Sequence, residues 1–369
     1  MTENSSYTIL ADKLGVPGSE RFIKILEAMF TPLEADVCRE LITPATCPEL
    51  AERLDVEEST MSEMLNNLID RGILTRGPTQ FGFHSSLIAF HHDAVADTAP
   101  HEGPFAVPQN VKELWSDFFR NEWCYMFVEN QEKTQAAGGR NLPISPSILA
   151  IERSPNISFD DLLPEENFKL KIEQAKSRII APCGCRVLWG VCDHPLMTCF
   201  ACFDRPRGEF YLNQPGRLLK EVTLAESLDI AREAEESGLV HWGDCYCCNC
   251  CCENLYSLTK VNRFDLMTPN RFAAQVDEEK CIGCQDCVER CPFGAIEMRK
   301  PAGSKRYKAY VDLEKCKGCG VCITGCKTNA MTYIIVRPPE YLTGGRVMSP
   351  SDSSKKARVV PVWGYYELK

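Results

Sequence analysis

The sequence of 369 residues contains no apolar run that approaches the roughly 18 residues of a membrane-spanning helix. Its first residues, Met-Thr-Glu-Asn-Ser-Ser, lack the basic and apolar segments of a secretory signal, so we expect a cytoplasmic protein. Basic residues are also in deficit, because 51 acidic residues outnumber 41 basic ones and give a net charge of −10. This charge balance argues against a protein that binds polyanions in general.

The usual catalytic motifs are absent as well. We find no paired nucleophile and base, no phosphate-binding loop and no dinucleotide fingerprint, and the Gly-Gly pair at 344–345 does not sit between a strand and a helix. We therefore expect no catalytic residues and no flavin or nicotinamide bound by this chain itself. The length predicts two or three domains, and the pattern of elements predicts an α+β multidomain fold.

Cysteine is the residue that the chain has in excess. There are 22 cysteines, and 19 of them lie between Cys183 and Cys326. Disulfides are the weaker explanation for a protein without an export signal. Ligation of metal ions or iron–sulfur clusters is the better explanation for such dense thiols.

Residues 1–98 form the first expected domain. Amphipathic patterns and caps predict helices over 20–30, 32–41, 47–54 and 57–71, followed by a hairpin with strands at 73–75 and 81–83. This order resembles the winged helix-turn-helix domains of bacterial and archaeal regulators. The helix over 57–71 would be the recognition helix, yet its only basic residue is Arg71, against four acidic ones. Because DNA affinity rests largely on Lys and Arg, we expect protein docking rather than DNA binding.

Residues 99–272 form an expected cysteine-rich α/β domain, with a short strand at 149–151 and a helix that begins at a capping box, Thr223 to Glu226. Its candidate metal ligands fall into two groups joined by that helix. They are Cys183, Cys185, Cys192 and Cys199, then Cys245, Cys247, Cys248, Cys250, Cys251 and Cys252. We expect at least one further [4Fe–4S] cluster here, with zinc as the alternative. His194 and His241 could also be ligands, although hydrogen bonding is the commoner role of a lone histidine.

Residues 273–335 contain one pattern twice, 35 residues apart. The first copy is Cys281-x-x-Cys284-x-x-Cys287-x-x-x-Cys291-Pro, and the second is Cys316-x-x-Cys319-x-x-Cys322-x-x-x-Cys326. Three thiolates at two-residue spacing suit a tight loop around a cubane cluster, and the fourth comes from elsewhere.

This stretch is similar to a bacterial two-[4Fe–4S] ferredoxin domain. In that family the last cysteine of each run ligates the other cluster. The resemblance implies one cluster held by Cys281, Cys284, Cys287 and Cys326. It implies a second cluster held by Cys316, Cys319, Cys322 and Cys291. Lys327 departs from the pattern, because proline commonly follows the fourth cysteine. Its charge and N–H would raise the potential of the cluster that Cys326 holds, unless its side chain lies in solvent.

The middle region resembles cysteine-rich modules that precede ferredoxin domains in iron–sulfur proteins of anaerobes. We expect Cys183, Cys185 and at least two cysteines of the run 245–252 to share one cluster, because the capped helix returns the second group to the first. Residues 336–369 form an expected extended tail that contacts a partner.

Together these features predict an oxygen-sensitive iron–sulfur protein or subunit that relays single electrons between a donor and a partner redox enzyme. Such a protein is more an electron-transfer component of an oxidoreductase system than a stand-alone enzyme. A redox-sensing transcription regulator with a winged-helix output is the first alternative. An enzyme with an open-site cluster in the middle domain is the second.

Overall fold

The structure is a computed structural model. It describes residues 5–97, 107–137, 139, 143–204, 219–243, 245–343, 358–359 and 366–367. The chain divides into two compact units: Met1–Trp123 with Ala181–Gly190 and Arg207–Lys220, and Cys124–Ile180 with Val191–Pro206 and Glu221–Lys369. The four-part division expected from the sequence remains a prediction. In the ranges described, no helix has the length and apolar character needed to cross a membrane.

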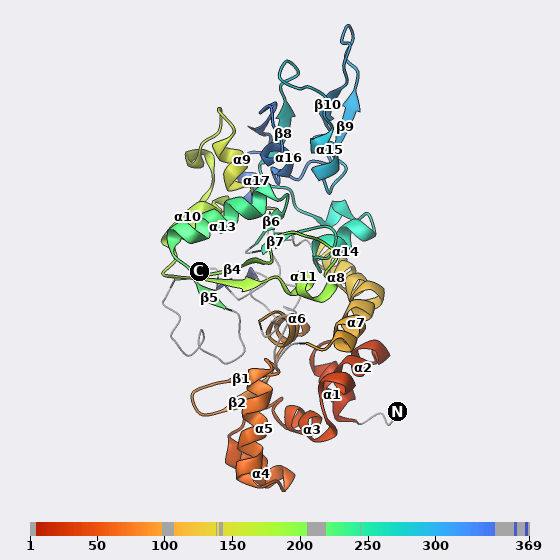
Figure 1. Ribbon diagram of the computed structural model, residues 1–369, viewed down its shortest axis with the longest axis vertical. Helices are drawn as coiled ribbons and strands as arrows, with labels where there is room; N and C mark the ends of the chain where they lie inside the picture. The colour runs from red at the N-terminus through yellow and green to blue at the C-terminus, as the bar shows by residue number, and fades with distance from the viewer. Residues whose placement is uncertain are drawn as a thin grey trace. The chain divides into compact units, whose positions relative to one another are not determined.

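The first unit opens with five helices and a hairpin, which Figure 1 labels. They are α1 Ser6–Lys13, α2 Glu20–Met29, α3 Pro32–Glu40, α4 Cys47–Leu54, α5 Glu58–Asp70, β1 Leu74–Arg76 and β2 Phe81–Phe83. Capping boxes begin α3 and α4, and Gly72, with φ +68°, follows the end of α5. The two strands pair antiparallel, Leu74 opposite Phe83. The helices and hairpin expected from the sequence are therefore confirmed as elements.

Aromatic side chains form the core of the first unit. The Phe22 ring lies 5.1 Å from Phe118 and 5.7 Å from Trp115, and Phe90 lies 6.1 Å from Trp115. These side chains come from α2, α6 Leu87–His91 and α7 Gln109–Phe118. The π-helix η1 His92–Asp97 follows α6, and the π-helix η2 Phe119–Trp123 follows α7. The unit also contains α11 Gly184–Trp189.

The second unit contains most of the remaining helices. They are α8 Cys124–Ala136, α9 Ile148–Glu152, η3 Phe159–Asp161, η4 Pro164–Glu166, α10 Phe168–Gln174, α13 Leu224–Glu236, α14 Leu255–Lys260 and η5 Phe264–Leu266. The capping box expected at Thr223 and Glu226 begins α13.

The prediction of a strand at 149–151 is wrong, because these residues lie in helix α9. The Ser147 hydroxyl accepts from the Ala150 N–H, and the Glu235 carboxylate accepts from the N–H groups of Ile148 and Leu149. These acceptors satisfy the free N–H groups of the first turn and outweigh the β propensity of the sequence.

A five-stranded sheet, with strands mainly in the second unit, has the order β5-β3-β4-β7-β6. The strands are β3 Ser177–Pro182, β4 Met197–Phe203, β5 Lys220–Glu221, β6 Val240–Trp242 and β7 Cys245–Cys247. Strand β7 pairs antiparallel with both neighbours, and Cys199 of β4 lies opposite Cys245. The sheet thereby brings residues from both groups of middle cysteines onto adjacent strands.

The C-terminal part of the second unit is built from two pairs of antiparallel strands and two short helices. They are β8 Phe272–Val276 with β11 Met331–Ile335, β9 Ile296–Arg299 with β10 Lys308–Val311, α15 Asp286–Arg290 and α16 Val321–Thr324. Beyond it lie α17 Glu340–Thr343 and the short antiparallel pair β12 Arg358–Val359 and β13 Tyr366–Glu367. Most of the tail expected at 336–369 lies outside the described residues.

Candidate metal centres

The two cysteine repeats adopt equivalent backbone conformations. The Asp277 N–H donates to the Ala330 carbonyl, and the equivalent Asp312 N–H donates to the Ala295 carbonyl, both at 2.8 Å. Each bond joins the start of one repeat to the end of the other. This crossed pairing brings the last cysteine of each run toward the loop of the opposite run.

Glycines allow the loops to pass close to the strands. Gly283 and Gly318 occupy equivalent positions, each with φ +76°. A Cβ atom on Gly318 would lie 1.9 Å from Asn270 Oδ1, and one on Gly283 would lie 2.5 Å from the Tyr307 carbonyl oxygen. Only glycine fits either position.

One cavity is lined by Cys291, Cys316, Cys319 and Cys322. The last three of these side chains are buried, with exposures of 6–8%. The other lining side chains include Ala274, Phe293, Ile296 and Val311. Apart from Lys317 and the four cysteines, the side chains that line this cavity are apolar. The four thiols are the set that crossed ligation assigns to one cluster.

A second cavity is lined by Cys281, Cys284, Cys287 and Cys326, the other crossed set. Its cysteines are more open to solvent: Cys284 is exposed, and the other three are partly exposed. The neighbouring Ile282 side chain is 52% exposed. Helix α15, which carries Cys287, packs against α16, which carries Cys322, so the two cavities are neighbours.

The chemistry of both cavities fits iron–sulfur clusters. Burial raises the pKa of Cys287 to about 11, and it also raises the pKa values of Cys291, Cys319 and Cys322. Thiolates are the ligands of iron, and buried thiolates need a neighbouring positive charge. Iron bound at the centre of each cavity would provide that charge.

Arg290 connects the two repeats to the end of α13. Its guanidinium donates to the Val321 carbonyl at 2.7 Å, to Thr324 Oγ1 at 3.0 Å and to the Glu236 carbonyl at 3.0 Å. Because Arg290 directly precedes Cys291 and Val321 directly precedes Cys322, these bonds fix the relative position of two cysteines from different repeats. No sequence pattern indicated this role.

Lys327 lies in solvent. Its side chain is 83% exposed, and its ammonium lies 3.2 Å from an Asp286 carboxylate oxygen. A screened and partly neutralised charge has little effect on a cluster potential. The structure therefore favours the alternative in which the Lys327 side chain lies in solvent and has little effect on the cluster potential.

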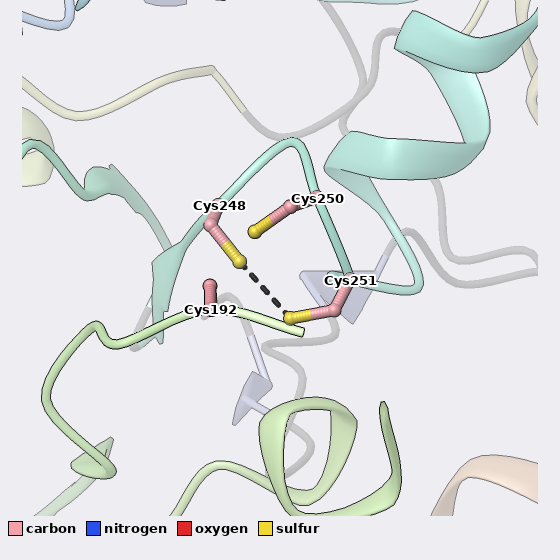
Figure 2. Close-up of side chains that lie close together, drawn as sticks. All are labelled: Cys192, Cys248, Cys250 and Cys251. Carbon is pink, nitrogen blue, oxygen red and sulfur yellow. Dashed lines mark hydrogen bonds between the residues drawn. The ribbon is translucent and has the colours of Figure 1, made fainter. Parts of the chain in front are cut away.

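In the middle region, the structure brings Cys192, Cys248, Cys250 and Cys251 together, with all four sulfur atoms within 4.8 Å of one another. Figure 2 shows the sulfurs of Cys248, Cys250 and Cys251 converging, and the Sγ atoms of Cys248 and Cys251 lie 3.1 Å apart. Contact with Cys248 raises the pKa of Cys250 to about 12. Cys248 and Cys251 are buried, whereas Cys192 and Cys250 are partly exposed.

The other candidate ligands are placed differently. Cys199 and Cys245 face each other across β4 and β7, with 3.1 Å between their sulfurs. Cys247 and Cys252 are buried. Cys183 and Cys185 belong to the first compact unit, so their sharing of a cluster with the run 245–252 stays a prediction.

His241 packs between aromatic rings, 4.0 Å from Phe168 and 4.8 Å from Tyr246. Burial lowers its pKa to about 3, so the imidazole is neutral.

Comparison with known families identifies the C-terminal pattern. Residues 280–330 match the model of the 4Fe-4S dicluster domain. No curated protein and no solved structure matched the chain. The match covers both cysteine repeats and agrees with the two four-cysteine cavities. The chain therefore carries a ferredoxin-like dicluster domain, which supports an iron–sulfur electron-transfer role.

Proposed function

We propose that this protein relays single electrons to and from a partner redox enzyme. The observation that carries the proposal is the pair of neighbouring four-cysteine cavities. Three of the four cysteines are buried in the inner cavity, whereas all four are partly or fully exposed in the outer one. Bound in these cavities, two [4Fe–4S] clusters would supply one-electron redox chemistry. Cys281, Cys284, Cys287 and Cys326 are the proposed ligands of the outer cluster, and Cys291, Cys316, Cys319 and Cys322 are those of the inner cluster.

The chain's own residues position both sites. Gly283 and Gly318 let the loops turn tightly, and Arg290 holds the two helices α15 and α16 together. The side chains around the inner cysteines are mostly apolar, among them Phe293, Ile296 and Val311. The exposed Ile282 and Cys284 mark the outer site as the point where a partner docks, because electron transfer is fastest over short distances.

Metal content and electrochemistry test the relay. Anaerobically purified protein should contain about eight iron and eight sulfide per chain in the dicluster domain. Both clusters should be reduced and reoxidised reversibly. When both are reduced, the electron paramagnetic resonance spectrum should show magnetic coupling between the two neighbouring clusters. Clusters that cannot be reduced without being destroyed would contradict a relay and indicate a structural role.

A surface variant tests the docking point. Ile282→Glu should slow reduction by a reduced two-cluster ferredoxin, used as a protein donor, while reduction by the small donor methyl viologen stays unchanged. Leu313→Glu is the matched control, because Leu313 is similarly exposed, at 46%, and does not line the outer cavity. Equal rates for both variants with the protein donor would place the docking point elsewhere.

We further infer that residues 1–98 form a winged-helix-like docking domain. The order of the short helices α2, α3 and α4, the longer helix α5 and the hairpin β1–β2 supports this. The exposed side chains of α5 include Glu58 and Glu63, and Arg71 just beyond it pairs with Glu34 at 2.6 Å. This acidic surface would repel phosphate, so it favours a protein partner over DNA. A duplex footprint at nanomolar protein and physiological salt would instead support the redox-sensing regulator.

A further inference from the structure

The four-cysteine group of the middle region has the dimensions of a mononuclear metal site. The sulfurs of Cys192, Cys248, Cys250 and Cys251 all lie within 4.8 Å of one another. Tetrahedral zinc with Zn–S bonds of about 2.3 Å places its sulfurs about 3.8 Å apart. A cubane separates its cysteine sulfurs by about 6 Å, because each sulfur binds a different iron atom.

The dicluster domain of the same chain supplies the comparison. None of its eight cysteines belongs to a group of three or more sulfurs as close as this, within the part of the chain that the structure describes. Those cysteines instead surround two cavities lined by further side chains. The cysteines of the dicluster domain therefore line wide cavities, whereas the four cysteines of the middle region form a compact group.

The local backbone explains why the group is compact. Three of the four cysteines come from one turn after β7, which the Cys252 N–H closes on the Cys248 carbonyl at 3.2 Å. A turn of this size cannot hold three thiols around a cubane, because adjacent Cys250 and Cys251 would have to reach separate irons. Cys192 comes from the segment before β4, whose pairing with β7 places the two segments together.

We propose that Cys192, Cys248, Cys250 and Cys251 bind one zinc ion in a closed, structural site. Four thiolates fill the tetrahedral shell and leave no open position for a substrate. Zinc has no preferred ligand-field geometry, so it accepts the irregular angles that adjacent cysteines impose. It also binds such ligands more tightly than divalent iron does. The ion would join two segments that are 56 positions apart in the sequence.

This site is separate from the electron relay and leaves it unchanged. Of the ten candidate ligands expected in the middle region, it uses four. Cys183, Cys185, Cys199, Cys245, Cys247 and Cys252 remain available for a further cluster.

Metal analysis of the intact holoprotein, produced with both iron and zinc supplied and purified anaerobically, tests the site. We expect one zinc per chain, and zinc X-ray absorption should show four sulfur neighbours at about 2.3 Å. Cys192→Ala and Cys250→Ala should lose the zinc and keep the iron of the parent. Cys202→Ala is the matched control, because Cys202 is a buried middle cysteine outside the group, and it should keep both metals.

The native protein keeps the proposal falsifiable if the variants fail to fold. Absence of zinc, iron bound at these four cysteines in place of zinc, or nitrogen and oxygen neighbours in the zinc absorption spectrum would each overturn the proposal. Zinc retained in full by both Cys192→Ala and Cys250→Ala would overturn it as well.

Discussion

The Tyr333 hydroxyl donates a 2.8 Å hydrogen bond to the Gly318 carbonyl, inside the loop between Cys316 and Cys319. The same hydroxyl accepts from the Ser147 N–H at 3.2 Å. Both partners are buried, so removal of the hydroxyl leaves a donor and an acceptor without a bond. The tyrosine thus couples the inner cluster loop to the beginning of α9.

We predict that Tyr333→Phe lowers the free energy of unfolding by about 1–3 kcal/mol. Iron at the inner site should be lost to a chelator faster than in the parent, whereas iron at the outer site should be lost at the parent rate. Tyr310→Phe is the control, because Tyr310 is 42% exposed. Identical chelation kinetics for Tyr333→Phe and the parent would show that the bond does not support the loop.

Gly318 should not tolerate a side chain. In Gly318→Ala the new methyl group would lie 1.9 Å from Asn270 Oδ1 and 2.4 Å from the Phe272 carbonyl oxygen. We expect the variant to retain about four of eight iron atoms, those of the outer site. Gly294→Ala is the matched control, because Gly294 also has a positive φ, +59°, and a Cβ there meets nothing within 4 Å. Its cost should be about 1 kcal/mol with full iron content; equal iron loss in both variants would contradict the steric explanation.

Arg290 should not be replaceable by lysine. A lysine ammonium cannot reach Val321, Thr324 and the end of α13 from one position, because it lacks the planar fork of arginine. We predict that Arg290→Lys lowers the free energy of unfolding by about 2–3 kcal/mol, measured by anaerobic thermal unfolding. Arg299→Lys should change it little, because the Arg299 side chain is 54% exposed and pairs with Glu297 at the surface. An unchanged free energy of unfolding in Arg290→Lys would show that the bonds to α16 and to the end of α13 do not depend on the guanidinium fork.

Local patterns in the sequence were sufficient to predict much of this molecule. The spacing of Cys281, Cys284 and Cys287 predicts a cluster loop because all three ligands lie within seven residues. The cap at Thr223 and the hairpin after Gly72 are likewise set by neighbouring residues. The dicluster domain is confirmed by its family match.

Contacts between distant residues could not be predicted in the same way. Residues 149–151 look like a strand, but Glu235, more than 80 residues away, accepts from the N–H groups of the helix that forms there. Cys192 meets Cys248 only because β4 pairs with β7. Neither contact is indicated by the periodicity or the residue spacing of the sequence. Each is made by the tertiary fold and could not be predicted from local patterns.

The exposure of Lys327 changes what is expected of its variants. Lys327→Gln removes a charge that lies in solvent beside Asp286, so both cluster potentials should stay at the parent values. Lys327→Pro removes the backbone N–H as well. If that N–H stabilises the reduced outer cluster, only the proline variant lowers its potential, and redox titration of both variants separates the two effects. A lower potential in Lys327→Gln would show that the charge acts on the cluster despite its exposure.

Glu235 should make stability depend on pH. It is buried at 1% exposure and accepts from Ser147, Ile148, Leu149 and Tyr246. Burial nevertheless raises its pKa from 4.5 to about 7, although each of those hydrogen bonds favours the ionised form. The folded protein therefore binds a proton that the unfolded chain releases near pH 4.5. The stabilising contribution is complete below that pH and is lost as the pH rises through 7.

We predict that the stability advantage of the parent over Glu235→Gln decreases as the pH rises from 4.5 to 7 and then levels off. Glutamine does not titrate, so the variant lacks this term, whose full size from pH 4.5 to 7 is about 3 kcal/mol. Anaerobic thermal unfolding across that pH range measures the difference. Glu236→Gln is the adjacent control, because the Glu236 side chain is 61% exposed, and its difference from the parent should not change with pH. An advantage over Glu235→Gln that is constant or grows with pH would mean that Glu235 is ionised in the folded protein throughout, because its four donors outweigh its burial.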